Sequence, residues 1–544
     1  MRRRALVAAV CLTSTLILPT APALAAPPSD PATEAVSRLP LQKLKWQRCL
    51  EPGVPARYAR LQCATLKAPR DWAKPNGPKI TLAISRLKAK SGKPKGVLFT
   101  NPGGPGQVGL FLPLILMDAG RTRLLQTQDV IGIDVRGTGY STQTRCKDAY
   151  YYPGLDPRDR SAPSIRRQLE EGASTAGACQ TGGGLPSRYV TTAQTVRDLE
   201  WIRRNLKTSN GKAVTKVNWL GYSAGTWLGA HYAAAFPKRA GRFVLDSNTQ
   251  FTGTWQQDNH RQPLGFQRRF ARDFAQWAAR YDGLYGLGTT APGVVARYEA
   301  VRAAIAGLSG VEVEYVDGTT DILYAADLDY LVAMSLYSKI QFPGLAADLR
   351  ALSPVIADAA ARALPVRLRA PDPYAGENPT FIKILCNDTP FQGTPAQHAA
   401  KSTEIGRKYP LVGYSLTSDP CAHWKRPQGV KLKRPTGKGL PRVLMIQSRT
   451  DAATPYEGAV IAHRKYKNSR LVTVNNEGDH ALYASGNACV DKVVDAYLID
   501  GVYPKKDRTC PGVPIPAPAN GRLAGVPDNP LLRARELAGT LKLG

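Results

Sequence analysis

Short apolar runs alternate with segments of helical spacing along this 544-residue chain, and this alternation constrains the fold more than any other feature. Apolar runs that end in glycine-rich turns are typical of inner strands in a parallel sheet. The predicted strands are residues 80–87, 96–100, 128–134, 214–220, 242–246, 442–446 and 470–474. Helical spacing between them predicts an α/β fold, with a mostly parallel sheet covered by helices on both faces.

Between residues 246 and 442 the strand pattern stops, and apolar residues recur at helical spacing instead. One β-α-β unit needs roughly 30 residues, so this stretch is far too long for a single connection. We therefore predict a large, mainly helical cap inserted into the sheet domain. The predicted layout is a core over residues 40–250, a cap over 251–435, the rest of the core over 436–515 and a C-terminal extension over 516–544.

The first 25 residues have the features of a secretory signal peptide. Arg2, Arg3 and Arg4 precede an apolar run over residues 5–18, and small residues follow up to the predicted cleavage point. A membrane-spanning helix takes about 20 apolar residues, and no later stretch of the chain approaches that length. We therefore expect a secreted protein without a membrane partner, and residues 26–39 are a candidate propeptide.

Eight cysteines remain after the signal peptide, and an even number in an exported chain favours disulfides. Many connectivities are combinatorially open. Pairing of neighbours is the most economical: Cys49–Cys63, Cys146–Cys179, Cys386–Cys421 and Cys489–Cys510. The chain has no Cys-x-x-Cys or His-Glu-x-x-His motif and only six histidines, so a zinc site is not expected.

The chain carries 73 Lys and Arg residues against 42 Asp and Glu residues, a formal net charge of +31. Such a charge raises the question of a nucleic-acid partner. The basic residues are scattered, and their densest groups are short, at residues 2–4, 203–204 and 505–508. Because no nucleic-acid-binding signature accompanies them, we expect no nucleic-acid partner and interpret most of the charge as solvating.

The strongest chemical signal is Gly221-Tyr-Ser-Ala-Gly225, which follows the predicted strand 214–220 and precedes a predicted helix over 226–236. Gly-x-Ser-x-Gly alone is a weak motif, but at a strand–turn–helix junction it presents a nucleophilic serine. Glycine neighbours avoid collisions at such a sharp turn, and the helix N-terminus favours a developing negative charge. We therefore predict Ser223 as the nucleophile, the alternative being an ordinary turn serine.

A serine hydroxyl needs a base, normally a histidine. His480 follows the predicted strand 470–474 by a short loop, and this is where a parallel sheet presents its active site. His231 is carried away from Ser223 by about 12 Å of helix rise. We predict His480 as the general base and acid, the alternative being a surface loop histidine.

A carboxylate should orient this imidazole, and the chain order in this architecture is serine, carboxylate, histidine. Asp451 follows the predicted strand 442–446 through a short loop, which fits that order. Glu457 lies within the next predicted helix, and Glu477 and Asp479 are too close to His480 in sequence to reach it. We therefore predict Asp451 as the third catalytic residue.

Two backbone N–H groups should stabilise the oxyanion that forms on the substrate. One is expected from Ala224, directly after the nucleophile. The other is expected from the glycine-rich loop 102–106 that follows the strand 96–100, where the backbone can approach the substrate closely. Within this loop we predict Gly104 as the donor.

Five motifs occur in this order: Asn101-Pro-Gly-Gly-Pro-Gly106, Asp134-Val-Arg-Gly-Thr-Gly-Tyr-Ser141, Gly221-Tyr-Ser-Ala-Gly225, Asp451-Ala-Ala-Thr-Pro455 and Gly478-Asp-His480. Together they resemble the secreted tripeptidyl aminopeptidases of actinomycetes, which are α/β-hydrolases related to the proline iminopeptidases. The resemblance implies the triad Ser223, Asp451 and His480 and the release of short, tripeptide-sized fragments from free peptide N-termini. One departure is Asp479, where relatives often have a second glycine before the histidine.

An aminopeptidase has to hold a cationic α-amine, which calls for carboxylates near the cleft. Asp388 is the candidate, since a disulfide at Cys386 would pin it, and the alternative is a capping or surface role. We expect a peptide with a free N-terminus as substrate, a monomer, and no metal or organic cofactor. Two other functions stay open: an exported carboxylesterase with the same triad, and a non-catalytic cationic protein that binds the cell wall.

Overall fold

The computed structural model describes residues 36–49, 56–315, 318–356, 366–368, 378–437, 439–515, 517–519 and 522–523. The expected signal peptide (1–25), most of the candidate propeptide (26–39) and most of the C-terminal extension (516–544) lie outside these residues. Among the helices of the described part, none combines the length and the apolar character needed to cross a membrane.

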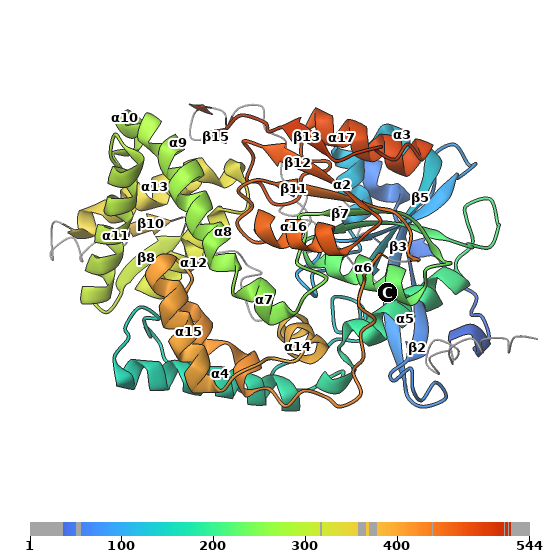
Figure 1. The fold of residues 1–544 in the computed structure, drawn as a ribbon, viewed down its shortest axis with the longest axis horizontal. Coiled ribbons are helices and arrows are strands. Elements are labelled where there is room, and N and C mark those ends of the chain that lie inside the picture. The colour runs from blue at the N-terminus through green and yellow to red at the C-terminus, as the bar shows by residue number, and fades with distance from the viewer. Residues whose placement is uncertain are drawn as a thin grey trace, which may run out of the picture.

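Ten strands form one sheet, in the spatial order β1-β2-β3-β5-β4-β6-β7-β11-β12-β13 (Figure 1). Their bounds in that order are Gln47–Arg48, Gln62–Pro69, Lys79–Leu87, Gln128–Asp134, Gly96–Asn101, Val217–Tyr222, Ala240–Asp246, Val443–Ser448, Ser469–Asn475 and Arg508–Pro511. The pairs from β5 to β13 are parallel, and those from β1 to β5 are antiparallel. The predicted α/β fold with a mostly parallel sheet is confirmed.

Both faces of the sheet are buried against helices. The helices of the core are α2 (Leu112–Asp118), α3 (Thr122–Thr127), α5 (Thr192–Asn205), α6 (Ala224–Ala235), α16 (Tyr456–Lys465) and α17 (Ala488–Asp495). Side chains alternate along the strands: Val97 and Phe99 face the apolar core that contains α5 and α6. Leu98 between them faces the core that contains α2, α3 and α17. This alternation explains the continuous apolar runs in the sequence, since a strand covered on both sides is apolar at every position.

Strand β2 was not predicted from the sequence, and its burial pattern gives the reason. Leu66 is buried, whereas its neighbours Thr65 and Lys67 are exposed. An antiparallel strand with one solvated face has alternating polar residues and therefore lacks the continuous apolar run of the inner strands.

A mainly helical cap lies between β7 and β11 and forms the left half of Figure 1, as predicted. Its helices are α7 (Trp255–Asn259), α8 (Gln262–Arg268), the π-helix η3 (Arg269–Phe274), α9 (Ala275–Arg280), α10 (Asp282–Tyr285), α11 (Ala291–Gly307), α12 (Ala325–Ser335), α13 (Phe342–Leu352), α14 (Pro379–Asp388) and α15 (Pro395–Lys408). The cap has its own apolar core, in which Phe270, Phe274 and Trp277 are fully buried. It also contains a small sheet that was not predicted, built from β8 (Val311–Tyr315), β9 (Thr320–Leu323) and β10 (Val366–Leu368).

A long helix from the core segment joins the cap. Helix α4 (Ala162–Thr181) comes between β5 and α5 in the chain, yet it packs along α15 and the short helices η7 (Tyr414–Ser418) and η8 (Pro420–His423) (Figure 1). The approach is close at Gly172, where a Cβ atom would lie 3.0 Å from the carbonyl oxygen of Ser418. The cap therefore includes a segment from outside the predicted insertion.

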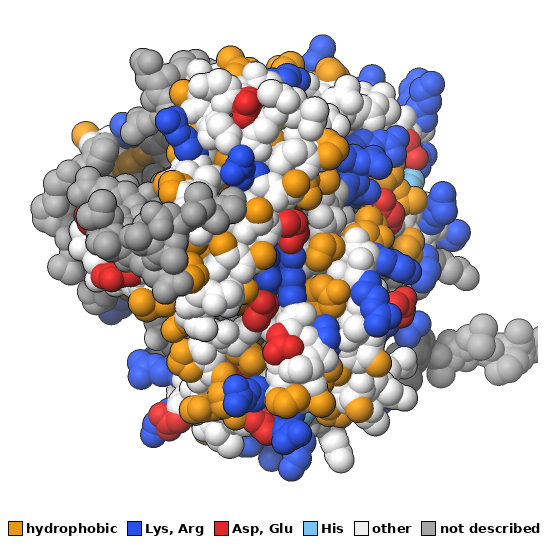
Figure 2. Space-filling model, turned by 90° about the vertical axis from the view of Figure 1, so that its left-hand side faces the viewer, with side chains coloured by type: hydrophobic (Ala, Val, Ile, Leu, Met, Phe, Trp, Pro, Cys, Tyr) orange, Lys and Arg blue, Asp and Glu red, His pale blue; other side chains and the backbone are white. Residues whose placement is uncertain are grey.

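The four disulfides join neighbouring cysteines, as predicted: Cys49–Cys63, Cys146–Cys179, Cys386–Cys421 and Cys489–Cys510. On the face of the cap shown in Figure 2, Lys and Arg side chains are spread among uncharged ones. That distribution agrees with a charge that mostly solvates the surface.

Candidate active site

Ser223 lies at the turn between β6 and α6, and its backbone is strained. Its φ is 55° and its ψ is −127°, a combination that a residue with a side chain rarely adopts. The turn needs glycine on both sides, because a Cβ atom on Gly221 would lie 2.3 Å from the carbonyl oxygen of Gly225, and one on Gly225 would lie 2.8 Å from that of Asn101. The strand–turn–helix arrangement predicted around Ser223 is therefore present, and the surrounding structure holds the serine in it.

Asp451 and His480 are hydrogen-bonded to each other. The Nδ1 atom of His480 lies 3.1 Å from both carboxylate oxygens of Asp451, and both side chains are buried. Asp451 Oδ1 also accepts hydrogen bonds from the backbone N–H groups of Ala453 and Thr454, at 3.0 and 2.9 Å. A carboxylate held in this way keeps the proton on Nδ1 and leaves Nε2 as the basic nitrogen of the imidazole.

Asp246, at the end of β7, links the serine turn to the histidine loop. Its carbonyl oxygen accepts a hydrogen bond from the Ser223 N–H at 2.9 Å. Its carboxylate accepts hydrogen bonds from the N–H groups of Leu482 and Tyr483, at distances between 2.7 and 3.1 Å. Ser223 and the loop of His480 are thus attached to the same strand end.

Asp246 was not predicted as a site residue. It is completely buried, and this desolvation raises the pKa of its carboxyl to about 6. The signal was in the sequence: Asp246 is an acidic residue at the carboxyl end of an otherwise apolar strand, and such a residue needs a partner.

The glycine-rich loop after β4 lies directly against the serine turn. A Cβ atom on Gly103 would lie 2.8 Å from Ser223 Cβ and 2.9 Å from the Ala224 nitrogen. Gly103 has a φ of +95° and Gly104 of +102°, which glycine adopts without strain. The Gly103 N–H already donates to Asn101 Oδ1 at 3.0 Å, so Gly104 stays the predicted oxyanion donor beside Ala224.

The cap fixes the position of His480. Asp479, the residue before it, accepts hydrogen bonds from the Arg269 guanidinium, from Ser338 Oγ and from the backbone N–H of Lys339. Arg269 is 1% exposed and makes a second ion pair with Asp273. Asp479 therefore anchors the loop of His480 to the cap.

Two more contacts hold the same loop. The Lys339 ammonium lies 2.7 Å from Glu477 Oε2, and both side chains are buried. The backbone N–H of His480 donates to the carbonyl oxygen of Tyr337 at 2.9 Å, and the Tyr337 ring meets the imidazole edge-on at 5.3 Å. We call these contacts between the cap and the loop of His480 the clamp. Its cap residues are far from His480 in sequence, and no local motif identifies them.

Asp388, the predicted amine-binding residue, lies at the end of α14 and is buried. Its carboxylate accepts hydrogen bonds from the Thr192 N–H at 2.8 Å and from the indole N–H groups of Trp227 and Trp255 at 3.2 and 3.4 Å. Burial raises the pKa of this carboxyl to about 6. These contacts give Asp388 a structural role at the junction of α5, α6 and the cap, and its part in binding substrate stays a prediction.

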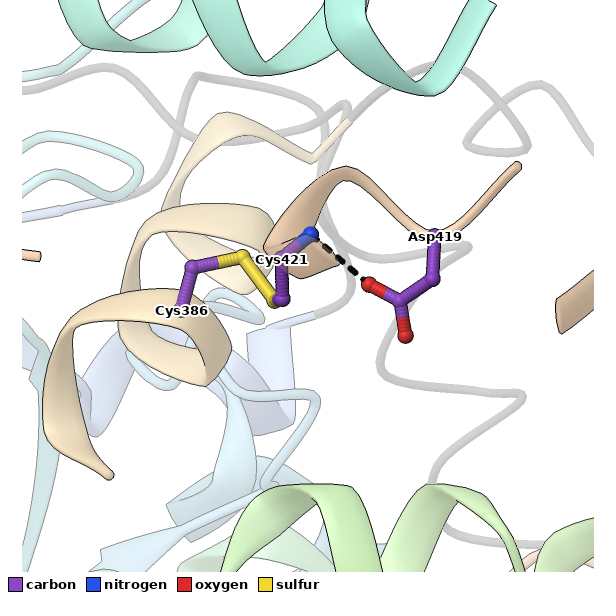
Figure 3. Close-up of side chains that lie close together, drawn as sticks. All are labelled: Cys386, Asp419 and Cys421. Atoms are coloured by element: carbon purple, nitrogen blue, oxygen red, sulfur yellow. Dashed lines mark hydrogen bonds between the residues drawn. A yellow bond between two sulfur atoms is a disulfide. The ribbon is translucent and has the colours of Figure 1, made fainter. Parts of the chain in front are cut away.

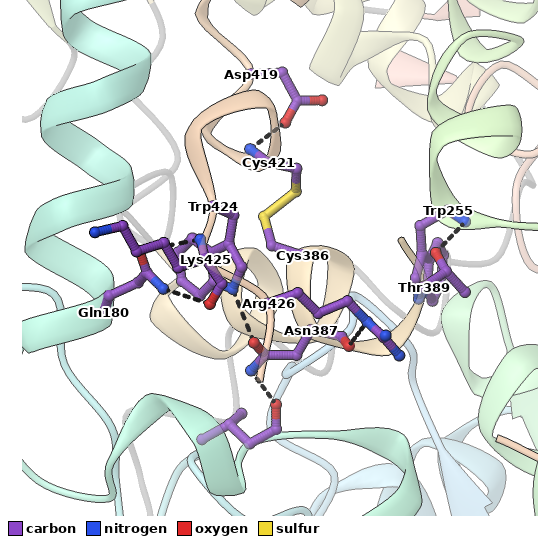
Figure 4. The surroundings of a disulfide bond; sticks show 11 residues. Gln180, Trp255, Cys386, Asn387, Thr389, Asp419, Cys421, Trp424, Lys425 and Arg426 are labelled. Carbon is purple, nitrogen blue, oxygen red and sulfur yellow. Dashed lines mark hydrogen bonds between the residues drawn. A yellow bond between two sulfur atoms is a disulfide. The ribbon is translucent and has the colours of Figure 1, made fainter. Parts of the chain in front are cut away.

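The side chains of Cys386, Asp419 and Cys421 lie close together, with a spacing that would suit a metal ion (Figure 3). The two sulfurs are joined in a disulfide and so are not available as thiolate ligands. Asp419 Oδ1 instead accepts a hydrogen bond from the Cys421 N–H at 2.8 Å. Around the disulfide, Trp424 and Arg426 donate to the side chain and the carbonyl oxygen of Asn387 (Figure 4). The group is a structural junction at the end of α14.

Two family models match the chain. Residues 96–282 match the model of the alpha/beta hydrolase fold, and residues 409–510 match the model of TAP-like proteins. The first match contains Ser223, and the second contains both Asp451 and His480.

Curated relatives extend over most of the chain. A tripeptidyl aminopeptidase of Streptomyces lividans is 32% identical over 84% of this chain and 85% of its own length. A serine protease of Mycobacterium tuberculosis is 27% identical over 86% of this chain and 91% of its own length. A protein of M. tuberculosis named carboxylesterase B is 29% identical over 90% of this chain and 95% of its own length. The chain therefore belongs to the tripeptidyl aminopeptidase family of α/β-hydrolases and is a serine hydrolase.

Proposed function

We propose that this protein is a secreted serine aminopeptidase that releases short fragments, tripeptides above all, from the free N-termini of peptides. Its triad is Ser223, His480 and Asp451. The observation that carries the proposal is the Asp451–His480 hydrogen bond, beside a strained serine tied to the same strand end. The four disulfides support export, because such bonds persist in oxidising compartments.

The reaction takes place in two steps through an acyl-enzyme. Ser223 Oγ attacks the carbonyl carbon of the scissile bond, while His480 Nε2 takes the hydroxyl proton. Asp451 stabilises the imidazolium that forms. The same proton passes to the leaving amine, the C–N bond breaks, and the N-terminal fragment remains as an ester on Ser223. A water molecule, deprotonated by His480, then hydrolyses this ester and restores the serine hydroxyl.

Backbone donors stabilise the tetrahedral intermediates of both steps. The Ala224 N–H lies at the first turn of α6, where the helix dipole also favours negative charge. The Gly104 N–H is the second donor, in a loop that Asn378 of the cap holds through Pro105 and Gly106. Removal of one such donor typically costs about 100- to 1,000-fold in kcat.

The cap supports an exopeptidase rather than an endopeptidase. It contacts the loop of His480 through Tyr337, Lys339 and Arg269, which supports a cap beside the proposed triad. A substrate can therefore present a chain end more readily than the middle of a long chain.

A carboxylesterase is the second candidate, because the same triad hydrolyses esters and one relative is named as such an enzyme. The test compares three substrates on the purified enzyme: a tripeptide amide with a free N-terminus, its N-acetylated form and a short-chain ester. We expect a kcat/KM for the free peptide at least about 100 times that for the acetylated one. Acetylation removes the ionic contact of the α-amine and leaves its desolvated carboxylate partner without a counter-charge. Equal rates on both peptides would contradict an aminopeptidase, and turnover of the ester alone would indicate the esterase.

A further inference from the structure

A groove with a volume of about 1340 Å³ is lined by residues of α5 and α6 and by the segment that follows the cap. Val196 of α5, Ala235 and the buried His231 of α6, and Tyr189 are among its lining residues. Lys425 and residues 427–433 also line it, and they belong to the segment that returns from the cap to β11. His231 lies eight residues after Ser223, about 12 Å along the helix axis, so the groove is separate from the active site.

The rim of this groove is strongly basic. Lys74, Arg188, Lys425, Lys431 and Lys433 line it, and all five are exposed. Within the described part of the chain, none of these five forms an ion pair. Asp71 is the acidic residue of the lining, and its carboxylate accepts hydrogen bonds from the Ala73 N–H and the Gln194 side chain.

The returning segment concentrates this charge in the sequence itself. Residues 425–438 read Lys-Arg-Pro-Gln-Gly-Val-Lys-Leu-Lys-Arg-Pro-Thr-Gly-Lys and contain no acidic residue. Its basic residues are spread over three places, at 425–426, 431 and 433–434, followed by Lys438. Three of these charges, on Lys425, Lys431 and Lys433, line one groove, whereas the charges on the cap face in Figure 2 are scattered.

We propose that this groove binds a linear polyanion, a flexible polymer with closely repeated negative groups. A groove of about 1340 Å³ is far larger than a compact ion needs, and the exposed cations along its rim, which form no ion pair in the described part of the chain, match repeated negative charges. Association with such a polymer gains free energy from the counterions it releases, so the affinity falls steeply with salt. Because the groove lies at the far end of α6 from Ser223, the bound polymer leaves the active site accessible.

The test measures binding of fluorescently labelled inorganic polyphosphate to the full-length mature enzyme by anisotropy, between about 50 and 200 mM NaCl. The groove variant combines Lys425→Gln, Lys431→Gln and Lys433→Gln. The matched control removes the same charge elsewhere, with Lys88→Gln, Lys90→Gln and Lys93→Gln, which are exposed residues between β3 and β4 outside the groove. Both variants change surface side chains, and unchanged peptidase activity reports that each is folded.

We expect the groove variant to bind polyphosphate at least about ten-fold more weakly than wild type, and its log–log salt slope to fall by about two. The control should bind within about two-fold of wild type. Equal losses in both variants would show that the net charge alone attracts the polymer and would overturn the proposal. Absence of wild-type binding at the lowest salt would overturn it as well. A parallel titration with poly-L-glutamate distinguishes a preference for phosphate from one for any polyanion.

Discussion

At the scale of single residues, the chemistry of this chain follows from a few hydrogen bonds at one edge of the sheet. The order of serine, aspartate and histidine after successive strands was readable in the sequence, because parallel strands bring their carboxyl ends together. Asp246 was only partly readable: its place at the end of an apolar strand shows in the sequence, but its partners Leu482 and Tyr483 are more than 200 residues away.

The Asp451–His480 bond predicts a large effect on turnover without loss of the fold. Asp451→Asn keeps the size of the side chain but favours the wrong imidazole tautomer, and we expect kcat to fall about 10,000-fold. Glu457→Gln is the matched control: Glu457 lies on the adjacent helix α16, is 43% exposed and pairs with Arg268. Steady-state kinetics on the free tripeptide amide should show near wild-type kcat for the control. A comparable kcat for both variants would contradict the role of Asp451.

Because Asp388 is buried, we expect the free energy of unfolding of the protein to depend on pH. Burial raises the pKa of its carboxyl from 3.8 to about 6, so the folded protein binds this proton more tightly than the unfolded chain does. Its stabilising contribution is fully present below about pH 4 and is lost as the pH rises through about 6. The wild type should therefore lose about 3 kcal/mol of unfolding free energy relative to Asp388→Asn between about pH 4 and pH 7. Urea denaturation of both proteins measures this difference, and a constant difference across that range would refute it.

At the scale of elements, most inner strands were predicted within a few residues, and the reason is their burial on both faces. Strand β2 and the small cap sheet were missed because their residues alternate or are few. The helical spacing predicted between residues 246 and 442 is present, for example, in α8, η3 and α9, with a π-helical turn between the two α-helices. That turn carries Arg269, and long-range ion pairs of this kind leave no periodic signal in a sequence.

The clamp between Arg269 and Asp479 predicts a positioning effect on His480. Asp479→Asn should lower kcat about 10- to 100-fold with little change in KM, because the histidine loses the contact that fixes its loop. Asp273→Asn is the control, since it removes the other carboxylate partner of the same guanidinium. We expect both variants to lower the melting temperature, but Asp479→Asn to reduce kcat far more. Equal kcat values would show that the clamp is structural only.

At the scale of the whole molecule, the apolar cores on the sheet and the core of the cap are linked by α4 and by the residues of the clamp. The sequence revealed the size and helical character of the cap, because no β-α-β connection is that long. It did not reveal that α4 belongs to this part, since packing between distant segments is decided by the folded chain. The disulfide Cys386–Cys421 connects α14 to η8, the short helix that packs against α4.

Removal of that disulfide should destabilise the protein. Replacing Cys386 and Cys421 together by alanine opens a loop with a sequence separation of 35 residues. We expect a loss of about 2–5 kcal/mol of unfolding free energy, measured by urea denaturation. The pair Cys489–Cys510, with a separation of 21, provides the comparison and should cost somewhat less. Unchanged stability without Cys386–Cys421 would show that other contacts suffice to hold α14 against η8.

The most direct test of the account is covalent labelling of the mature enzyme with a fluorophosphonate probe, followed by mass spectrometry of its peptides. The account predicts one modified residue, Ser223, and loss of labelling in Ser223→Ala and in the His480→Ala variant that lacks the base. Labelling at another serine, or full peptidase activity in Ser223→Ala, would contradict it.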